Sequence, residues 1–203
     1  MLLQNTVYPW SNLHRDRTRV AGLMGNRGSI HDKNREVKKK TWAGERWICC
    51  ARDFKGIDRR PLWAGSYSEL FFLDEATAYA AGHRPCNDCR KTEFGIFKKL
   101  WGDMERSVRA ADIDAQLHRE RLSSEGTKLT YRAPLHALPP GAMVAHGSKA
   151  YLVRAHGVRL WTAAGYVPAE LAAETQVEVL TPESIVRLIA GGLPVQVHAS
   201  ADA

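Results

Sequence analysis

The stretch ELFFLDEATAYAAGHRPCNDCRK, residues 69–91, carries the strongest local structural signals in the chain. Its aromatic start is typical of a β-strand. Asp74 then stands where the N-cap of a helix is expected, and the Ala-rich segment that follows ends at Gly82. Cys86 and Cys89 come soon after, separated by two residues. The stretch therefore predicts a strand, a helix and a tight turn that presents two thiols.

The pattern of the rest of the chain predicts an α+β fold, with its strands in two groups. We expect a zinc-stabilised strand–helix module with a basic N-terminal segment, followed by a β-rich C-terminal lobe. The boundary falls near residue 133, so that 1–132 and 133–203 form either two units or a single compact one. The expected elements are a strand in 45–54, helices in 90–101 and 113–122, a polar linker over 123–132, a β-meander over 141–166, and a strand, helix and strand in 175–198, with Thr181 as the N-cap of the last helix.

Composition indicates an ordinary globular protein of 203 residues, with 44% hydrophobic and 25% charged residues. No apolar run approaches the ~18 residues of a membrane helix, and the first residues lack the pattern of a secretory signal. We therefore expect a cytoplasmic protein without a membrane partner. In a reducing compartment its four cysteines favour metal ligands or reactive thiols over disulfides. The oligomeric state stays open.

Positive charge is concentrated in the first third of the chain. Residues 1–65 hold 14 Lys and Arg against 6 Asp and Glu, whereas residues 66–203 hold 15 against 16. A segregated basic segment is typical of a surface that faces phosphates, so DNA is the expected partner, although single charge runs are often only solvated. The candidate DNA contacts are Arg27, Lys38, Lys39, Lys40, Arg46, Arg59, Arg60 and Arg84.

Cys86 and Cys89 have the spacing at which a tight turn directs two thiolates to one zinc ion. Cys49 and Cys50 are the remaining cysteines, but neighbouring side chains on a strand point to opposite faces, so one of the two is expected not to bind. A histidine then completes the site, with His83 nearest in sequence and His31 more distant. A redox dithiol and inert buried thiols are the alternatives.

The stretch that contains these cysteines resembles the N-terminal zinc-binding domain of the Ada DNA-repair protein, over about residues 46–92. A strand, an Ala-rich helix and a GxRPCxxC turn follow one another in the same order in that family. The resemblance implies bound zinc and bound DNA, with Cys86 and Cys89 as the second pair of ligands. The family's first pair has three residues between its cysteines, whereas Cys49 and Cys50 are adjacent. Methyl transfer to a cysteine is therefore not carried over.

Chemistry on DNA needs further groups, and two places offer them. The first is GLMGNRGSIHDKN, residues 22–34, where the recurring glycines and Arg27 suit a phosphate. Asn26, His31 and Asp32 in this stretch form a candidate hydrolytic set. A plain surface loop explains the pattern equally well. Glu69 lies on an apolar strand and is the other candidate catalytic carboxylate, with a salt-bridged structural role as its alternative.

Three functions remain open. The favoured one is a zinc-containing DNA-binding enzyme for damaged or modified DNA, most of all a DNA glycosylase that excises a modified base. The second is a nuclease that uses His31 and Asp32. The third is a DNA-binding regulator without catalytic activity.

Overall fold

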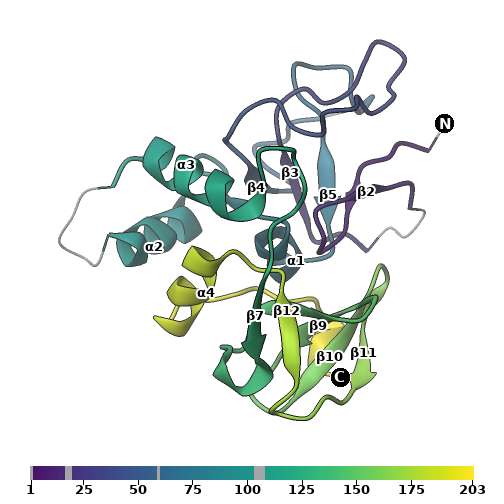
Figure 1. Ribbon diagram of the computed structural model, residues 1–203. Helices are drawn as coiled ribbons and strands as arrows, with labels where there is room; N and C mark the ends of the chain where they lie inside the picture. The colour runs from purple at the N-terminus through teal and green to yellow at the C-terminus, as the bar shows by residue number, and fades with distance from the viewer. Residues whose placement is uncertain (1, 17–19, 59, 103–107) are drawn as a thin grey trace.

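The computed structural model describes residues 2–16, 20–58, 60–102 and 108–203. Within these segments the chain forms two six-stranded sheets, one above the other in Figure 1, with helices between them and beside them. The predicted α+β class is therefore confirmed. In the described segments, no helix combines the length and the apolar character needed to cross a membrane.

The first sheet is mixed and comes from the N-terminal half. The pairs β1/β5 and β4/β6 are parallel, whereas the pairs β1/β2, β3/β4 and β3/β5 are antiparallel. The strand predicted in 45–54 corresponds to β4, and the strand predicted at the aromatic start of residues 69–91 corresponds to β5. In spatial order the sheet consists of β2 (Leu13–His14), β1 (Thr6–Val7), β5 (Leu70–Phe72), β3 (Leu23–Asn26), β4 (Ile48–Ala51) and β6 (Arg84–Pro85).

The two faces of this sheet have different neighbours. Cys49 belongs to a buried apolar cluster with Leu70 and Phe72 that includes Ala78 and Ala81 of the helical segment. On the outer face the register places Phe71, Met24 and Cys50 opposite one another on adjacent strands. Because side chains alternate along a strand, Cys49 and Cys50 point into these two different environments.

The helix α1 (Glu75–Ala80) is fully buried and lies between the two sheets (Figure 1). Asp74 is its N-cap as predicted, and one carboxylate oxygen accepts the Thr77 N–H at 2.9 Å. The other oxygen accepts the Tyr166 hydroxyl at 2.8 Å and the His198 backbone N–H at 3.0 Å. The cap of α1 is thus also a contact between the two halves of the chain.

Donors on distant segments satisfy the carbonyl groups at the other end of α1. Lys128 Nζ donates to the carbonyls of Ala80, at 2.7 Å, and Leu180, at 2.8 Å, and Arg121 donates to the carbonyl of Gly82 at 2.8 Å. Cations are favoured here because a helix concentrates negative partial charge at its C-terminus. Burial, with Arg27 and Arg121 nearby, lowers the pKa of Lys128 to about 7.

The second sheet is antiparallel and comes from the C-terminal half. Its spatial order is β11 (Gly165–Ala169), β10 (Val158–Thr162), β9 (Lys149–Val153), β8 (Met143–His146), β12 (Gln176–Val179) and β7 (Tyr131–Pro134). The predicted meander is confirmed as β8 to β10, and β11 extends it. The expected linker over 123–132 runs into β7, which begins at Tyr131 because its backbone pairs with β12.

The end of the chain differs from the prediction in two ways. Pro182, not Thr181, is the N-cap of α4 (Glu183–Ala190). The Thr181 hydroxyl instead accepts the Met143 N–H at 2.9 Å and fastens the helix to β8. No strand is found in the described segment 193–198, where a last strand was expected.

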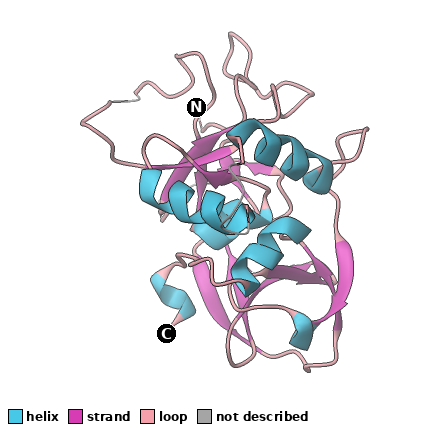
Figure 2. Ribbon diagram, turned by 90° about the vertical axis from the view of Figure 1, so that its left-hand side faces the viewer, coloured by secondary structure: helices cyan, strands magenta, loops and turns pink. Residues whose placement is uncertain are grey.

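The other two long helices are α2 (Lys91–Trp101) and α3 (Ala110–Arg121). α2 corresponds to the helix predicted in 90–101, and it buries Phe94 and Phe97 against Ile113 and Leu117 of α3 and residues of α4. α3 begins at Ala110, earlier than expected. Figure 2 looks at the molecule from the side on which these helices lie and shows them in front of the sheets.

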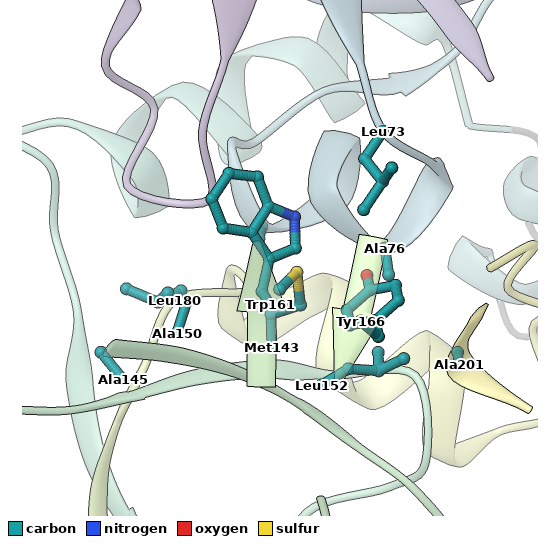
Figure 3. Close-up of a cluster of buried hydrophobic side chains, with 11 residues drawn as sticks. Leu73, Ala76, Met143, Ala145, Ala150, Leu152, Trp161, Tyr166, Leu180 and Ala201 are labelled. Atoms are coloured by element: carbon teal, nitrogen blue, oxygen red, sulfur yellow. The ribbon is translucent and has the colours of Figure 1, made fainter. Parts of the chain in front are cut away.

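A shared apolar core joins the two halves. Leu73 and Ala76 from the first half pack with Met143, Trp161 and Tyr166 from the second (Figure 3). The Trp161 indole N–H also donates to the Thr77 hydroxyl at 3.1 Å. The two halves therefore bury a common interface.

We expect Asp74→Ala to lower the free energy of unfolding by about 3 kcal/mol, because it leaves several buried donors without an acceptor. Urea unfolding followed by circular dichroism measures the change. Asp112→Ala is the matched control, since Asp112 also lies in a first helical turn but is exposed. Equal shifts of the two midpoints would show that Asp74 does not join the halves.

Candidate metal centre

Three of the four cysteines converge on one point at the outer face of the first sheet. The sulfurs of Cys50, Cys86 and Cys89 all lie within 4.8 Å of one another. Thiolates that share a tetrahedral zinc ion are about 3.8 Å apart, as Zn–S bonds of about 2.3 Å require. A small contraction would place all three at bonding distance, so the donor set fits zinc.

The backbone around β4 and β6 produces this convergence. Cys86 N–H donates to the Cys49 carbonyl at 2.9 Å, which continues the parallel pairing past Pro85. The chain then turns, with Arg90 N–H donating to the Cys86 carbonyl at 3.2 Å, and enters α2. Cys50 is presented by the strand, whereas Cys86 and Cys89 are presented by the turn beside it.

Backbone amides support negative charge on these sulfurs. Ala51 N–H donates to Cys89 Sγ and Asp88 N–H to Cys86 Sγ, both at 3.4 Å. Hydrogen bonds, above all from the Cys50 thiol, lower the pKa of Cys86 to about 5, and the same contact raises the pKa of Cys50. Burial raises the pKa of Cys89. Cys86 is thus the first thiolate, and a divalent cation would favour ionisation of the other two.

Cys49 and His83, which were candidate ligands, lie outside this group. Cys49 faces the interior, where Arg90 donates to its sulfur at 3.3 Å, and burial raises its pKa to about 12. His83 is fully buried, and its Nε2 accepts the Arg27 Nε–H at 3.2 Å. Strand alternation excludes Cys49, and the interior position excludes His83.

Among the described residues, no fourth Cys, His, Asp or Glu joins the three sulfurs. Zinc with three protein ligands keeps one coordination position for water or another molecule, whereas closed structural sites have four ligands. The fourth ligand expected from the sequence is therefore absent from the described part of the chain. His31, the more distant histidine considered for it, is engaged with Ser68 instead.

An open cleft on the outer face of the sheet is lined by Met24, Phe71 and Arg52. None of the three cysteines lines it, but Met24 packs against Cys50 and Cys86 and so connects the cleft to them. This cleft is not visible in the sequence, because only strand pairing sets Phe71, Met24 and Cys50 in one row.

His31 and Asp32 line one surface depression with Arg35 and Trp63. Ser68 Oγ accepts the Ile30 N–H at 2.9 Å and lies 2.6 Å from His31 Nδ1. The serine oxygen keeps a second lone pair, so this contact is compatible with either tautomer of the ring. In both cases it orients the His31 ring and leaves Nε2 outside the contact.

The other predicted catalytic groups have different surroundings. Asp32 accepts the N–H groups of Asn34 and Glu36, both at 2.9 Å, and such backbone bonds lower its pKa. Asn26 lines a separate depression with Arg46. The predicted hydrolytic set therefore reduces to His31 and Asp32.

Glu69 is buried and supports a strained residue. Its carboxylate accepts the Trp63 backbone N–H at 2.8 Å, and its carbonyl accepts the Trp63 indole N–H at 3.0 Å. Trp63 has a φ of 62°, a conformation that bulky residues rarely adopt. Its ring stacks on His31, with centroids 5.2 Å apart. Glu69 therefore positions Trp63 and is not open to a substrate.

Two of the predicted DNA contacts are wrong for this fold. Arg27 and Arg84 are each only 1% exposed. Arg27 lies over the Trp47 ring and donates to the Ser11 carbonyl, whereas Arg84 forms a bidentate pair with Asp114 at 2.8 Å. Both guanidinium groups make their contacts inside the protein and do not face DNA.

Of the remaining predicted DNA contacts, one is not described by the structure and five are exposed to solvent. Arg59 lies outside the described residues. The exposed members of the set are Lys38, Lys39, Lys40, Arg46 and Arg60.

Comparisons with protein-family models, curated proteins and solved structures found no match to this chain. The resemblance to the Ada zinc domain is thus reduced to the three-cysteine cluster.

We expect the purified protein to hold one zinc ion per chain. Cys50→Ser, Cys86→Ser and Cys89→Ser should each lower zinc affinity, because each removes a thiolate that the ion needs. Elemental analysis and titration against a chromogenic chelator measure the loss. Cys49→Ser is the matched control, since it alters the adjacent residue on the opposite face and should retain zinc. The assignment would be contradicted if Cys49→Ser lost as much zinc as the other variants. It would also be contradicted if none of the four variants lost zinc.

Proposed function

We propose that the protein is a zinc-containing DNA-binding enzyme that acts on a modified base, with excision of that base as the reaction. The observation that carries the proposal is the position of the three-cysteine group beside an open cleft in the half of the chain that holds the basic segment. Zinc would hold β4, the turn and α2 in place, and its remaining coordination position would admit water or a substrate atom.

The exposed lysines supply the attraction for DNA. Lys38, Lys39 and Lys40 are consecutive and exposed, and Lys40 Nζ lies 5.0 Å from the centre of the Trp42 ring. Cations interleaved with an aromatic ring suit a nucleic acid, because phosphates pair with the ammonium groups and a base can stack on the ring.

Excision needs a proton donor for the departing base, and His31 is the best-placed group for it. When His31 is protonated, its Nδ1–H donates to the Ser68 hydroxyl, and the Nε2 proton passes to the departing base, which leaves a neutral imidazole. Water adds to the sugar carbon as the base–sugar bond breaks, and the carboxylate of Asp32, on the next residue, stabilises the imidazolium before the transfer. Glu69, the other candidate carboxylate, holds Trp63 in position, and the Trp63 ring in turn stacks on His31.

Hydrolysis of the phosphate backbone is the second candidate, because the same depression also contains Arg35, which suits a phosphate. The two reactions differ in their products. Excision leaves an abasic site that breaks only in alkali, whereas a nuclease cuts the strand directly.

For binding, we expect the triple variant Lys38→Gln, Lys39→Gln, Lys40→Gln to weaken association with duplex DNA. The slope of log K against log salt should fall by about 2.7, as the loss of three phosphate contacts requires. Fluorescence anisotropy of a labelled duplex at several salt concentrations measures it.

A control variant removes three exposed cations of the second half and should leave the slope unchanged; it carries Arg132→Gln, Lys149→Gln and Arg187→Gln. Identical slopes for both triple variants, or no binding at low salt, would refute DNA as the partner.

For catalysis, we expect alkali-dependent breakage of duplexes that contain a modified base, and His31→Ala should slow it by about a hundredfold or more. Denaturing gels with and without alkali separate excision from direct cutting. His146→Ala is the control, because His146 is exposed on the second sheet. Breakage without alkali favours the nuclease, and no breakage of any modified substrate leaves neither reaction standing.

A further inference from the structure

A second cavity lies where the first sheet meets the second half of the chain. It has a volume of about 500 Å³. Its lining includes the buried apolar residues Val7, Leu73 and Trp161, and Phe71 forms a further wall. Cavities of this size with apolar walls are typical sites for small organic groups.

Asn5 is a polar residue in the wall of the cavity, and it is only 9% exposed. Its backbone carbonyl accepts the Phe71 N–H at 2.8 Å. Its side-chain amide makes no hydrogen bond within the described residues, yet it is not among the fully buried polar atoms without a partner. The amide is therefore accessible, and it offers a ligand a donor and an acceptor side by side.

The rim of the cavity is charged. Arg35, Arg52 and Asp16 line it. Asp16 accepts the Tyr8 hydroxyl at 3.0 Å, and Arg52 donates to the Ala21 carbonyl at 2.8 Å. A ligand that fits this arrangement has a flat apolar ring, an edge with a paired donor and acceptor, and an anionic substituent. Nucleobases that carry a sugar phosphate have all three features.

The cavity is linked to both features described above. Arg52, Leu62 and Phe71 also line the cleft that reaches Met24 beside the cysteines, and Arg35 also lines the depression of His31. The cavity therefore adjoins both the depression that holds the candidate proton donor and the cleft that reaches Met24.

We propose that this cavity is a nucleobase pocket, in which the Asn5 amide pairs with the edge of the base, Phe71 and Trp161 contact its ring, and Arg35 holds its phosphate. This inference deepens the proposed function and rests on it for the source of the base, an extruded nucleotide of DNA. A free nucleoside monophosphate presents the same chemistry and is tested separately.

The first experiment titrates the zinc-loaded protein with the four deoxynucleoside 5′-monophosphates and follows the indole N–H signals by NMR. We expect at least one nucleotide to shift the Trp161 signal, assigned with Trp161→Phe, whereas deoxyribose 5-phosphate leaves it in place. Asn5→Leu should raise the Kd by about tenfold or more, as the loss of a paired base contact implies. Asn12→Leu is the matched control, since Asn12 is exposed and lies outside the cavity.

The second experiment measures binding of a duplex with one unpaired base against the fully paired duplex. Asn5→Leu should weaken the preference for the unpaired base but leave binding to the paired duplex unchanged. DNA binding without any effect of Asn5→Leu, on DNA or on mononucleotides, overturns the pocket and leaves the proposed function intact. Mononucleotide binding that depends on Asn5, without binding to DNA, supports the pocket for free nucleotides and overturns the proposed function.

Discussion

Burial of the short helix α1 is the constraint on which the rest of this structure depends. A six-residue helix is too short to be stable alone, so its ends must be satisfied by other segments. Asp74 and Glu75 at its start accept hydrogen bonds from the second half, including the Gln196 N–H at 3.0 Å. Lys128 and Arg121 bind the carbonyls at its end. The two sheets are held together because both contribute to this one helix.

The same helix connects the candidate metal centre to the second half of the chain. Arg90 follows Cys89 directly and forms a buried ion pair with Glu75 at 2.8 Å. Glu75 in turn accepts the Tyr79 hydroxyl at 2.9 Å. A buried charge pair is costly to break, so the turn that presents two of the cysteines is fixed relative to α1. The positions of the Cys86 and Cys89 sulfurs therefore depend on the packing of α1 against both halves of the chain.

The positive charge of the first third has two distinct uses. Arg27 is buried over the Trp47 ring, at 4.1 Å, and donates to a backbone carbonyl, and Arg121 from later in the chain lies over the same ring at 4.0 Å. Lys38 to Lys40 are exposed. The charge count of the sequence includes both kinds and cannot separate them, because a guanidinium group that binds carbonyls inside the protein looks the same in sequence as one that faces phosphate.

The sequence by itself determined the α+β class, the N-cap at Asp74, the meander and the turn that carries Cys86 and Cys89, because these follow from local propensity and short spacing. It also indicated that only one of Cys49 and Cys50 would join the turn. Tertiary structure alone decided that this cysteine is Cys50, that Arg27 and Arg84 are buried, and that Asn5 lines a cavity. These outcomes depend on which face of the sheet α1 covers, and that is set by contacts between segments far apart in the chain.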